Sequence, residues 1–153
     1  MIAKVPDAIV GIGTILNADD LARAEALGAV FGISPGATPD LLKAAAASAL
    51  PFAPGIATAS ELMQALAHGF DLVKFFPAEQ SGGIASLKAF ASPLADVKFC
   101  PTGGITAKNA ADYLSLPNVI CVGGSWVAPD DLIKAGKWDE IEALAREASK
   151  LKK

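Results

Sequence analysis

The chain has 153 residues, of which 52% are hydrophobic and 19% charged, and its formal net charge is −3. A chain of this size and apolar content can bury a sizeable core, so we expect a single domain over residues 1–153. The mild acidity, without a basic stripe, excludes a nucleic-acid partner. No apolar stretch is long enough to cross a bilayer and no signal-peptide pattern opens the chain, so we expect no membrane partner and a cytoplasmic location.

The scarcity of histidine and cysteine excludes several kinds of active site. His68 is the only histidine, so we expect neither a catalytic triad nor a multi-histidine metal site. We read His68 as the last residue of a helix. Cys100 and Cys121 lie in apolar runs without metal-ligand spacing, which predicts buried, reduced thiols. We therefore expect neither a metal nor another cofactor.

Apolar runs alternate with amphipathic stretches along the whole chain. Residue pattern predicts strands at 8–12, 29–33, 51–54, 72–76, 97–100 and 119–122. Helices are predicted at about 17–27, 38–47, 60–67, 84–90 and 107–114, followed by C-terminal helices. Asn17 and Thr38 are suitable N-terminal caps, and Gly69 is a suitable helix stop.

This alternation predicts βα units on a parallel sheet, because the strands are apolar on both faces and helices separate them. Six units are recognisable, whereas a closed (β/α)8 barrel needs eight and rarely fits in fewer than about 200 residues. The segment 11–16 lacks the third glycine of a dinucleotide-binding turn. Two architectures therefore remain: an open α/β sheet, or a barrel that lacks two units.

The residues that follow the strands favour the barrel. Each predicted strand ends in a polar or Gly/Pro cluster, namely 13–14, 34–36, 54–55, 74–79, 101–104 and 123–125. In a barrel these ends converge on one face, which carries the active site, and the last two loops frequently bind phosphate. Gly103-Gly104 and Gly124-Ser125 occupy those last two loops, and glycines let backbone N–H groups approach an anion closely.

Lys74 stands alone in the apolar run of residues 70–77. Two interpretations apply to it. Its stem can pack while the ammonium reaches water. Alternatively, desolvation favours the neutral amine, which is a nucleophile that forms a Schiff base with a carbonyl substrate. Strand alternation places Phe76 on the same face as Lys74 and Phe75 on the opposite face.

Several motifs, in this order along the chain, resemble those of the 2-keto-3-deoxy-6-phosphogluconate (KDPG) aldolases. They are Gly11-Ile12-Gly13-Thr14, Ile33-Ser34-Pro35-Gly36, Pro54-Gly55-Ile56, Lys74-Phe75-Phe76-Pro77-Ala78-Glu79, Phe99-Cys100-Pro101-Thr102-Gly103-Gly104-Ile105 and Cys121-Val122-Gly123-Gly124-Ser125-Trp126. The resemblance covers essentially the whole chain. It implies a class I aldolase on a (β/α)8 TIM barrel, usually a homotrimer, that acts in the Entner–Doudoroff pathway.

The resemblance also implies roles for individual residues. Lys74 is expected to be the Schiff-base lysine. The expected substrate-binding residues are Thr14, Pro35, Phe76 and Thr102, and the expected phosphate-binding residues are Gly103, Gly104, Gly124 and Ser125. The implied reaction cleaves a phosphorylated keto acid to pyruvate and glyceraldehyde 3-phosphate without a metal. Glu79 belongs to the motif beside Lys74, and we expect a structural role for it.

The start of the chain departs from the family pattern. The segment Met1–Asp7 matches the end of the family's second helix, so we expect the chain to hold strands 3 to 8 of the barrel. The two missing units carry the glutamate that the resemblance implies as general acid/base and an arginine that contacts substrate. Two alternatives to the KDPG aldolase activity remain: a related aldolase for 2-dehydro-3-deoxy-6-phosphogalactonate or 4-hydroxy-2-oxoglutarate, and an inactive partial barrel that binds phosphate esters or self-associates.

Overall fold

The structure is a computed structural model that describes residue 5 and residues 7–151. The interpretation of Met1–Asp7 as the end of a helix falls mainly outside these residues. The chain groups into two compact units, Met1–Phe76 (unit 1) and Pro77–Lys153 (unit 2). The prediction of a single domain stays a prediction.

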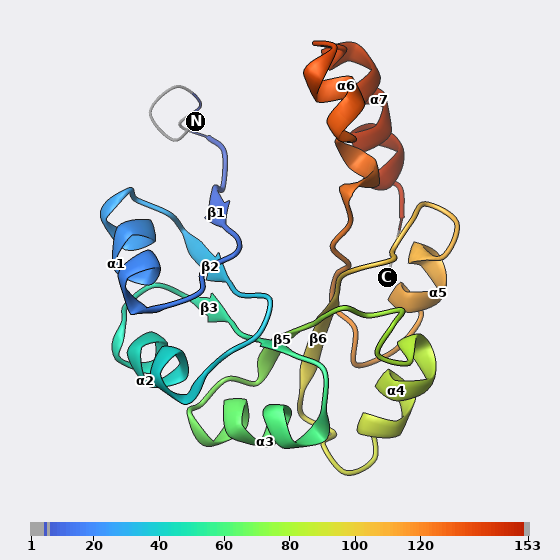
Figure 1. The fold of residues 1–153 in the computed structure, drawn as a ribbon. Helices are drawn as coiled ribbons and strands as arrows, with labels where there is room; N and C mark the ends of the chain where they lie inside the picture. Colours follow the sequence, from blue (N-terminus) through green and yellow to red (C-terminus); the bar gives the residue numbers. More distant parts are fainter. Residues whose placement is uncertain (1–4, 6, 152–153) are drawn as a thin grey trace. The chain divides into compact units, whose positions relative to one another are not determined.

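Unit 1 alternates short strands with helices of two to three turns (Figure 1). Its elements are β1 (Gly11–Ile12), α1 (Ala18–Ala26), β2 (Phe31–Ile33), α2 (Pro39–Ala47), β3 (Phe52–Ala53), β4 (Gly55–Ile56), α3 (Ala59–Ala67) and β5 (Leu72–Phe75). The predicted order of elements in residues 8–76 is confirmed. The strands are shorter than predicted, and the first is reduced from 8–12 to Gly11–Ile12.

The strands of unit 1 pair in parallel, as predicted for βα units. β1, β2 and β3 form one sheet in that order, with Gly32 opposite both Ile12 and Phe52. β4 pairs in parallel with β5, with Gly55 opposite Lys74. Pro54 separates β3 from β4, so the segment 52–56 changes its partner from β2 to β5 at the residue that has no N–H to donate.

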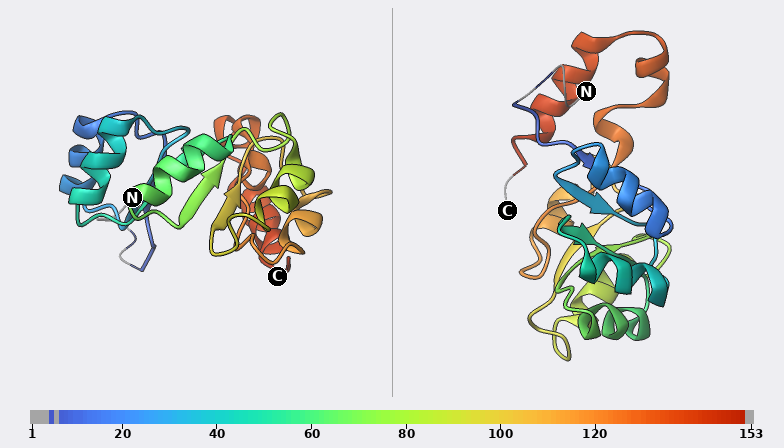
Figure 2. Two further views of the ribbon diagram at one scale, coloured as in Figure 1. Left: turned by 90° about the horizontal axis from the view of Figure 1, so that it is seen from below. Right: turned by 90° about the vertical axis from the view of Figure 1, so that its left-hand side faces the viewer.

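Helices α1 and α2 lie side by side on the same side of β1, β2 and β3 (Figures 1 and 2). They bury a core against these strands that consists of Ile15, Leu21, Ala24, Leu41, Ala45, Leu50 and Phe52. The predicted caps are confirmed. The side chain of Asn17 accepts a hydrogen bond from the Asp20 N–H at 2.8 Å, and that of Thr38 accepts one from the Leu41 N–H at 3.2 Å.

Helix α3 begins with a reciprocal capping arrangement that was not predicted. The Thr58 hydroxyl accepts a hydrogen bond from the Glu61 N–H, while the Glu61 carboxylate accepts from the Thr58 N–H at 2.8 Å and from the Ala57 N–H at 2.7 Å. His68 is the C-terminal cap of α3, as predicted, and Gly69 follows with a φ of 88°.

Unit 2 contains fewer strand residues than predicted. Its elements are α4 (Gly83–Phe90), β6 (Lys98–Pro101), α5 (Ala110–Leu114), the 3-10 helix η1 (Ser125–Val127), α6 (Asp130–Lys134) and α7 (Trp138–Ala148). Its fully buried side chains include Leu87, Val97, Phe99, Tyr113 and Val119. α6 and α7 lie side by side and confirm the predicted C-terminal helices (Figures 1 and 2).

The prediction of a strand at Val119–Val122 is wrong, since this segment forms no continuous ladder with β6. Only two isolated parallel bridges occur, Phe99 with Val119 and Thr102 with Gly123. Two residues lie between the bridged positions of the β6 segment, and three lie between those of the segment 119–123. The extra residue interrupts the pairing in the manner of a β-bulge. It leaves Ile120 42% exposed and Cys121 exposed, so Cys121 is not the buried thiol that was predicted.

Two further differences concern unit 2. Cys100 is half-buried rather than buried. Helix α5 starts at Ala110, three residues later than predicted, because the Asn109 side chain closes a turn before it. The Asn109 Oδ1 accepts from the Thr106 N–H at 2.8 Å, and its Nδ2 donates to the Gly104 carbonyl at 3.1 Å. Within the described residues, none of the helices has the length and apolar character needed to cross a membrane.

Candidate active site

Lys74 is the third residue of β5, and the strand positions its side chain by simple alternation. Val73 and Phe75 are fully buried, at 0% exposure, whereas Leu72 and Lys74 are half-buried. The backbone of Lys74 is fixed by a hydrogen bond from its N–H to the Pro54 carbonyl at 2.9 Å. The side chain of Lys74 is thus only partly withdrawn from water.

The ring of Phe76 lies beside the reactive end of Lys74. The Nζ atom is 4.4 Å from the ring centroid, a distance suited to a cation–π contact. Phe75 points the other way, into the core. The prediction that Phe76 shares a face with Lys74 and that Phe75 does not is therefore confirmed. Phe76 restricts where the Lys74 amine can point.

Pro35 lies next to the strand that pairs with Lys74. Gly55 is opposite Lys74 in the ladder, and a Cβ on Gly55 would lie only 2.2 Å from the carbonyl carbon of Pro35. The Pro35 backbone therefore packs directly against Gly55, and only glycine permits this approach. Pro35 and Lys74 are therefore both neighbours of Gly55 at the carboxyl edge of the unit 1 strands.

Ser34 holds this edge together and was not singled out from the sequence. Its side chain is 0% exposed, and its Oγ accepts a hydrogen bond from the Gly55 N–H at 3.1 Å. Ser34 thereby joins β2 to β4 at the point where Pro54 interrupts the ladder. A single serine between apolar residues gives no local signal of this role, because its partner is 21 residues away.

Thr14 follows β1 at the same carboxyl edge of the sheet and is exposed. It is the only non-glycine residue with a positive φ among those that the structure describes, at 61°. This conformation is unusual for a β-branched residue, and such outliers are concentrated at functional sites. The strained backbone aims the Thr14 side chain differently from an ordinary strand residue. This supports its expected place in the site of unit 1.

The first glycine loop of unit 2 follows β6. Gly103 and Gly104 have φ values of 98° and 77°, so two successive residues adopt the left-handed region. The loop is held from one side by the segment after β5, where the N–H groups of Ala78 and Glu79 donate to the carbonyls of Thr102 and Gly103 at 2.8 and 3.2 Å. Successive backbone N–H groups in such loops form concave anion sites.

The second glycine loop lies directly against the first. Gly123 is bridged to Thr102, and its N–H donates to the Pro101 carbonyl at 2.8 Å. A Cβ on Gly123 would lie 2.5 Å from the Thr102 hydroxyl oxygen, and one on Gly124 would lie 3.0 Å from the Ile105 carbonyl oxygen. Ser125 follows as the exposed first residue of η1. The structure thus brings together Thr102 and both glycine loops within unit 2.

Glu79 contacts the first glycine loop with its side chain. A Cβ on Gly104 would lie 2.4 Å from the Glu79 Cγ, so the stem of Glu79 packs on this glycine. The Tyr113 hydroxyl of α5 donates a hydrogen bond to the Glu79 Oε1. Burial of Tyr113, together with this hydrogen bond and the negative charge of Glu79, raises the pKa of the phenol, which therefore stays protonated. These contacts agree with the structural role expected for Glu79.

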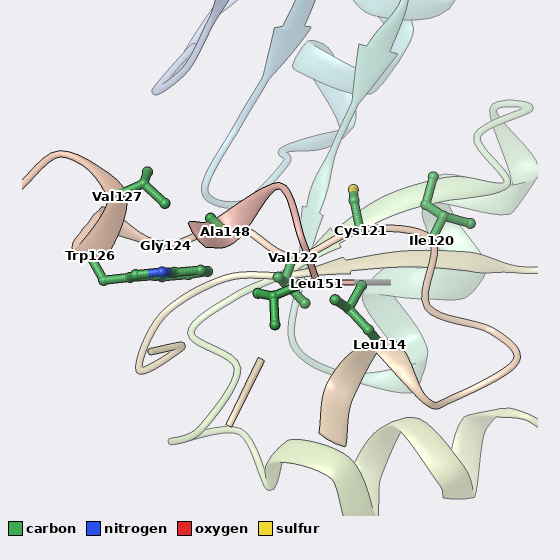
Figure 3. Close-up of a pocket in the computed structure, with 9 residues that line it drawn as sticks. All are labelled: Leu114, Ile120, Cys121, Val122, Gly124, Trp126, Val127, Ala148 and Leu151. Carbon is green, nitrogen blue, oxygen red and sulfur yellow. The ribbon is translucent and has the colours of Figure 1, made fainter. Parts of the chain in front are cut away.

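A pocket of about 420 Å³ borders the second glycine loop (Figure 3). Its lining is Leu114, Ile120, Cys121, Val122, Gly124, Trp126, Val127, Ala148 and Leu151, and the side chains of Cys121 and Val122 point to opposite sides of the backbone. No charged side chain lines it, so it offers no cationic partner to the carboxylate of a keto acid. Among the described residues, no three His, Cys, Asp or Glu side chains are grouped as metal ligands would be.

The family model for KDPG and KHG aldolases matches residues 1–144. The chain belongs to this family. It is 54% identical over 145 residues to the 2-dehydro-3-deoxy-phosphogluconate aldolase of Pseudoalteromonas atlantica, which covers 95% of this chain and 67% of that protein. It is also 54% identical to the KHG/KDPG aldolase of Escherichia coli K12, over 95% of this chain and 68% of that protein.

Solved structures of KDPG aldolases have the same fold. One from Legionella pneumophila, with pyruvate captured as a covalent carbinolamine intermediate, matches with a TM-score of 0.94 and 47% identity over 96% of this chain and 71% of that one. One from Zymomonas mobilis, with 3-phosphoglycerate, matches with a TM-score of 0.90 and 48% identity. The match covers 99% of this chain and 71% of that one. The predicted parallel α/β fold of a KDPG aldolase is confirmed.

Proposed function

We propose that this family member is a class I aldolase that cleaves 2-dehydro-3-deoxy-6-phosphogluconate to pyruvate and glyceraldehyde 3-phosphate, the aldol cleavage of the Entner–Doudoroff pathway. The observation that carries this proposal is Lys74, half-buried on β5 with its Nζ 4.4 Å from the Phe76 ring centroid. A carbinolamine is the adduct that a lysine amine forms with a keto group, and the Legionella relative was captured with pyruvate in that form.

In the proposed reaction, the neutral amine of Lys74 attacks the C2 ketone and forms the carbinolamine. Loss of water gives a protonated imine. The electrons of the C3–C4 bond then move toward this cation, which leaves an enamine on Lys74, while the C4 hydroxyl loses its proton and C4 becomes the aldehyde. The enamine takes a proton at C3, and water hydrolyses the imine to release pyruvate and restore Lys74. The iminium is the electron sink for the C3–C4 cleavage.

A base must accept the C4 hydroxyl proton, and Lys74 cannot do so while it is an iminium. Thr14 and Pro35 are proposed to bind the pyruvate end, because both lie at the carboxyl edge of unit 1 together with Lys74. Phe76 is proposed to orient the amine. We assign no residue of this chain as the base.

The glycine loops of unit 2 are proposed to bind the phosphate group. Gly103 and Gly104 both have a positive φ in the loop that follows β6, and Thr102, Gly124 and Ser125 adjoin them. Among the described residues, the N–H groups of Gly104 and Gly124 donate to no protein acceptor. Binding energy from a remote phosphate orients the reacting carbon without taking part in the chemistry.

We further propose that the βα units of the chain correspond to strands 3 to 8 of a (β/α)8 barrel, that the enzyme acts in the cytoplasm, and that it assembles as a homotrimer. The first of these is supported by the parallel pairing and by the match to about two thirds of the length of the relatives. The homotrimer has the support of the family resemblance, and the cytoplasmic location has that of relatives named as metabolic aldolases.

A second candidate substrate is 4-hydroxy-2-oxoglutarate, because the Escherichia coli relative is named a KHG/KDPG aldolase. A comparison of kcat/KM on this acid, on the phosphogluconate-derived acid and on its phosphogalactonate isomer separates the candidates. The proposal predicts the highest value for the phosphogluconate-derived acid and no cleavage by Lys74→Arg. A higher kcat/KM on one of the other two acids would assign that acid as the substrate. Cleavage by Lys74→Arg would refute the Schiff-base mechanism.

A further inference from the structure

Glu79 makes three separate contacts with groups that shape the first glycine loop. Its N–H donates to the Gly103 carbonyl at 3.2 Å, its stem packs on the Cα of Gly104, and its carboxylate accepts the hydrogen bond of the Tyr113 hydroxyl. Tyr113 itself is 1% exposed, so the phenol is a rigid anchor within the core of unit 2. The loop is therefore tied to α5 through one side chain.

The same carboxylate lies at the start of α4. A Cβ on Gly83, the first residue of that helix, would lie 2.9 Å from the Tyr113 hydroxyl oxygen and 3.6 Å from the Glu79 Oε1. A carboxylate is stabilised at a helix N-terminus by the helix dipole. The carboxylate of Glu79 thus lies beside Tyr113 and the start of α4, with Gly104 packed against its stem.

The charge of Glu79 is unfavourable for the proposed function of the loop. A carboxylate next to an anion site repels the anion, so Glu79 does not serve by attracting phosphate. Its contacts instead fix the positive-φ conformation of Gly103 and Gly104, whose N–H groups must converge on the phosphate oxygens. Preorganised donors bind more tightly than donors that have to be ordered on binding.

We propose that Glu79 and Tyr113 are positioning residues that hold the Gly103-Gly104 loop in its phosphate-binding conformation through the hydrogen bond between them. This inference rests on the proposed function, because it requires the loop to be a phosphate site. This positioning role predicts different outcomes for two substitutions at position 79, whereas a general structural role of Glu79 would not separate them. The contact needs a hydrogen-bond acceptor at position 79, but it does not need a negative charge there.

The test is the dissociation constant for inorganic phosphate, measured by calorimetric titration on the full chain and its variants. Tyr113→Phe and Glu79→Ala each remove the hydrogen bond and are expected to weaken phosphate binding about tenfold or more. Glu79→Gln keeps an acceptor oxygen for Tyr113 and removes the repulsive charge, so its affinity is expected to equal or exceed that of the original chain.

Glu142→Gln is the matched control, because this substitution removes the same charge as Glu79→Gln. Glu142 lies on α7, and its side chain contacts Arg146 in an exposed ion pair. The phosphate affinity of this variant is expected to be unchanged. Circular dichroism on each variant reports folding, and if Tyr113→Phe does not fold, the pair Glu79→Ala and Glu79→Gln decides. Equal weakening in both Glu79 variants, or full affinity in Tyr113→Phe, would overturn the inference.

Borohydride trapping of pyruvate on the unchanged protein separates this inference from the proposed function. If Tyr113→Phe and Glu79→Ala bind phosphate as tightly as the original chain, and pyruvate is still trapped on Lys74, only the positioning role is refuted. An unchanged protein that binds no phosphate refutes both the phosphate site and its positioning. Failure to trap pyruvate in a protein that binds phosphate refutes the aldolase mechanism and leaves the outcome for Glu79 and Tyr113 to the titrations.

Discussion

At the scale of single residues, strand alternation predicted the side chains around Lys74 correctly. Phe75 is fully buried, and Phe76 shares the face of Lys74 with its ring beside the amine. Alternation is a local property of the backbone and needs no knowledge of the rest of the fold. Ser34 and Tyr113 were missed because their partners, Gly55 and Glu79, lie 21 and 34 residues away. No short sequence pattern connects such pairs.

The two phenylalanines give a matched test of this arrangement. Phe75→Ala empties a core position and is expected to lower the free energy of unfolding by about 3–5 kcal/mol. Phe76→Ala removes a half-buried ring and is expected to cost less stability. Because the ring beside Nζ also stabilises the positive charge of the iminium that forms there, its loss should slow imine formation at Lys74 about threefold to tenfold, the equivalent of roughly 0.7–1.4 kcal/mol. Chemical denaturation and the rate of borohydride trapping measure the two effects. Equal effects of both substitutions on both measurements would contradict the assignment of the two faces.

At the scale of elements, helix caps were predicted better than strands. The caps of α1 and α2 follow from residues within one turn, and both formed as predicted. The capping box of α3 carried a local signal as well, a threonine with a glutamate three residues later, which the prediction overlooked. The failed strand at Val119–Val122 depended on its register with β6. A mismatch of one residue between the two bridges is a property of the pair of segments, and neither segment shows it alone.

The capping box of α3 predicts how stability depends on pH. Burial alone would raise the pKa of Glu61, but hydrogen bonds from the Ala57 and Thr58 N–H groups and the Thr58 side chain outweigh it and lower the pKa below its ordinary value of 4.5. Because the pKa of Glu61 is lower in the folded state than in the unfolded state, its carboxylate stabilises the fold at pH values above the unfolded-state pKa. This contribution is lost as the pH falls through the folded value.

Glu61→Gln keeps an acceptor oxygen but removes the charge, so it is expected to be destabilised relative to the original chain at pH 7 by about 0.3–1 kcal/mol, the usual contribution of a carboxylate at a helix N-terminus. The difference should disappear as the pH falls below 4.5 toward acid. Urea denaturation at a series of pH values measures it, and Glu25→Gln on α1 is a control of the same chemistry with one exposed contact, to Ser48. A difference that persists unchanged at low pH would show that the Glu61 charge does not act through the cap.

At the scale of the whole molecule, the chain spans about two thirds of the length of the curated relatives that it matches. Large apolar side chains near the first strand are exposed, with Ile9 at 78% and Val30 at 51%. An exposed strand edge with apolar neighbours recruits other chains. The 153-residue chain alone is therefore expected to self-associate, as measured by light scattering after size-exclusion chromatography. A monodisperse monomer with a cooperative melting transition would contradict this expectation.

Fusion of the first two βα units of a relative ahead of residue 1 tests the proposed correspondence to strands 3 to 8. The added units would pair with β1, cover the apolar side chains near it and bring the glutamate that the family resemblance implies as general acid/base. We expect kcat for aldol cleavage to rise about 10²–10⁴-fold, the usual contribution of a positioned proton shuttle. The same fusion with that glutamate changed to glutamine is the control and should lack the increase. If kcat rises equally in the fusion with the glutamate and in the fusion with glutamine, the increase comes from improved folding and not from a proton shuttle.

The nucleophilic role of Lys74 is the claim on which the whole account depends. Incubation of the folded chain with pyruvate and sodium borohydride, followed by peptide mass spectrometry, tests it directly, with Lys74→Arg as the control that keeps the positive charge. The account predicts one reduced pyruvyl adduct, located on Lys74 and absent from the Lys74→Arg protein. No adduct on the folded chain, or an adduct on other lysines that persists in Lys74→Arg, would contradict it.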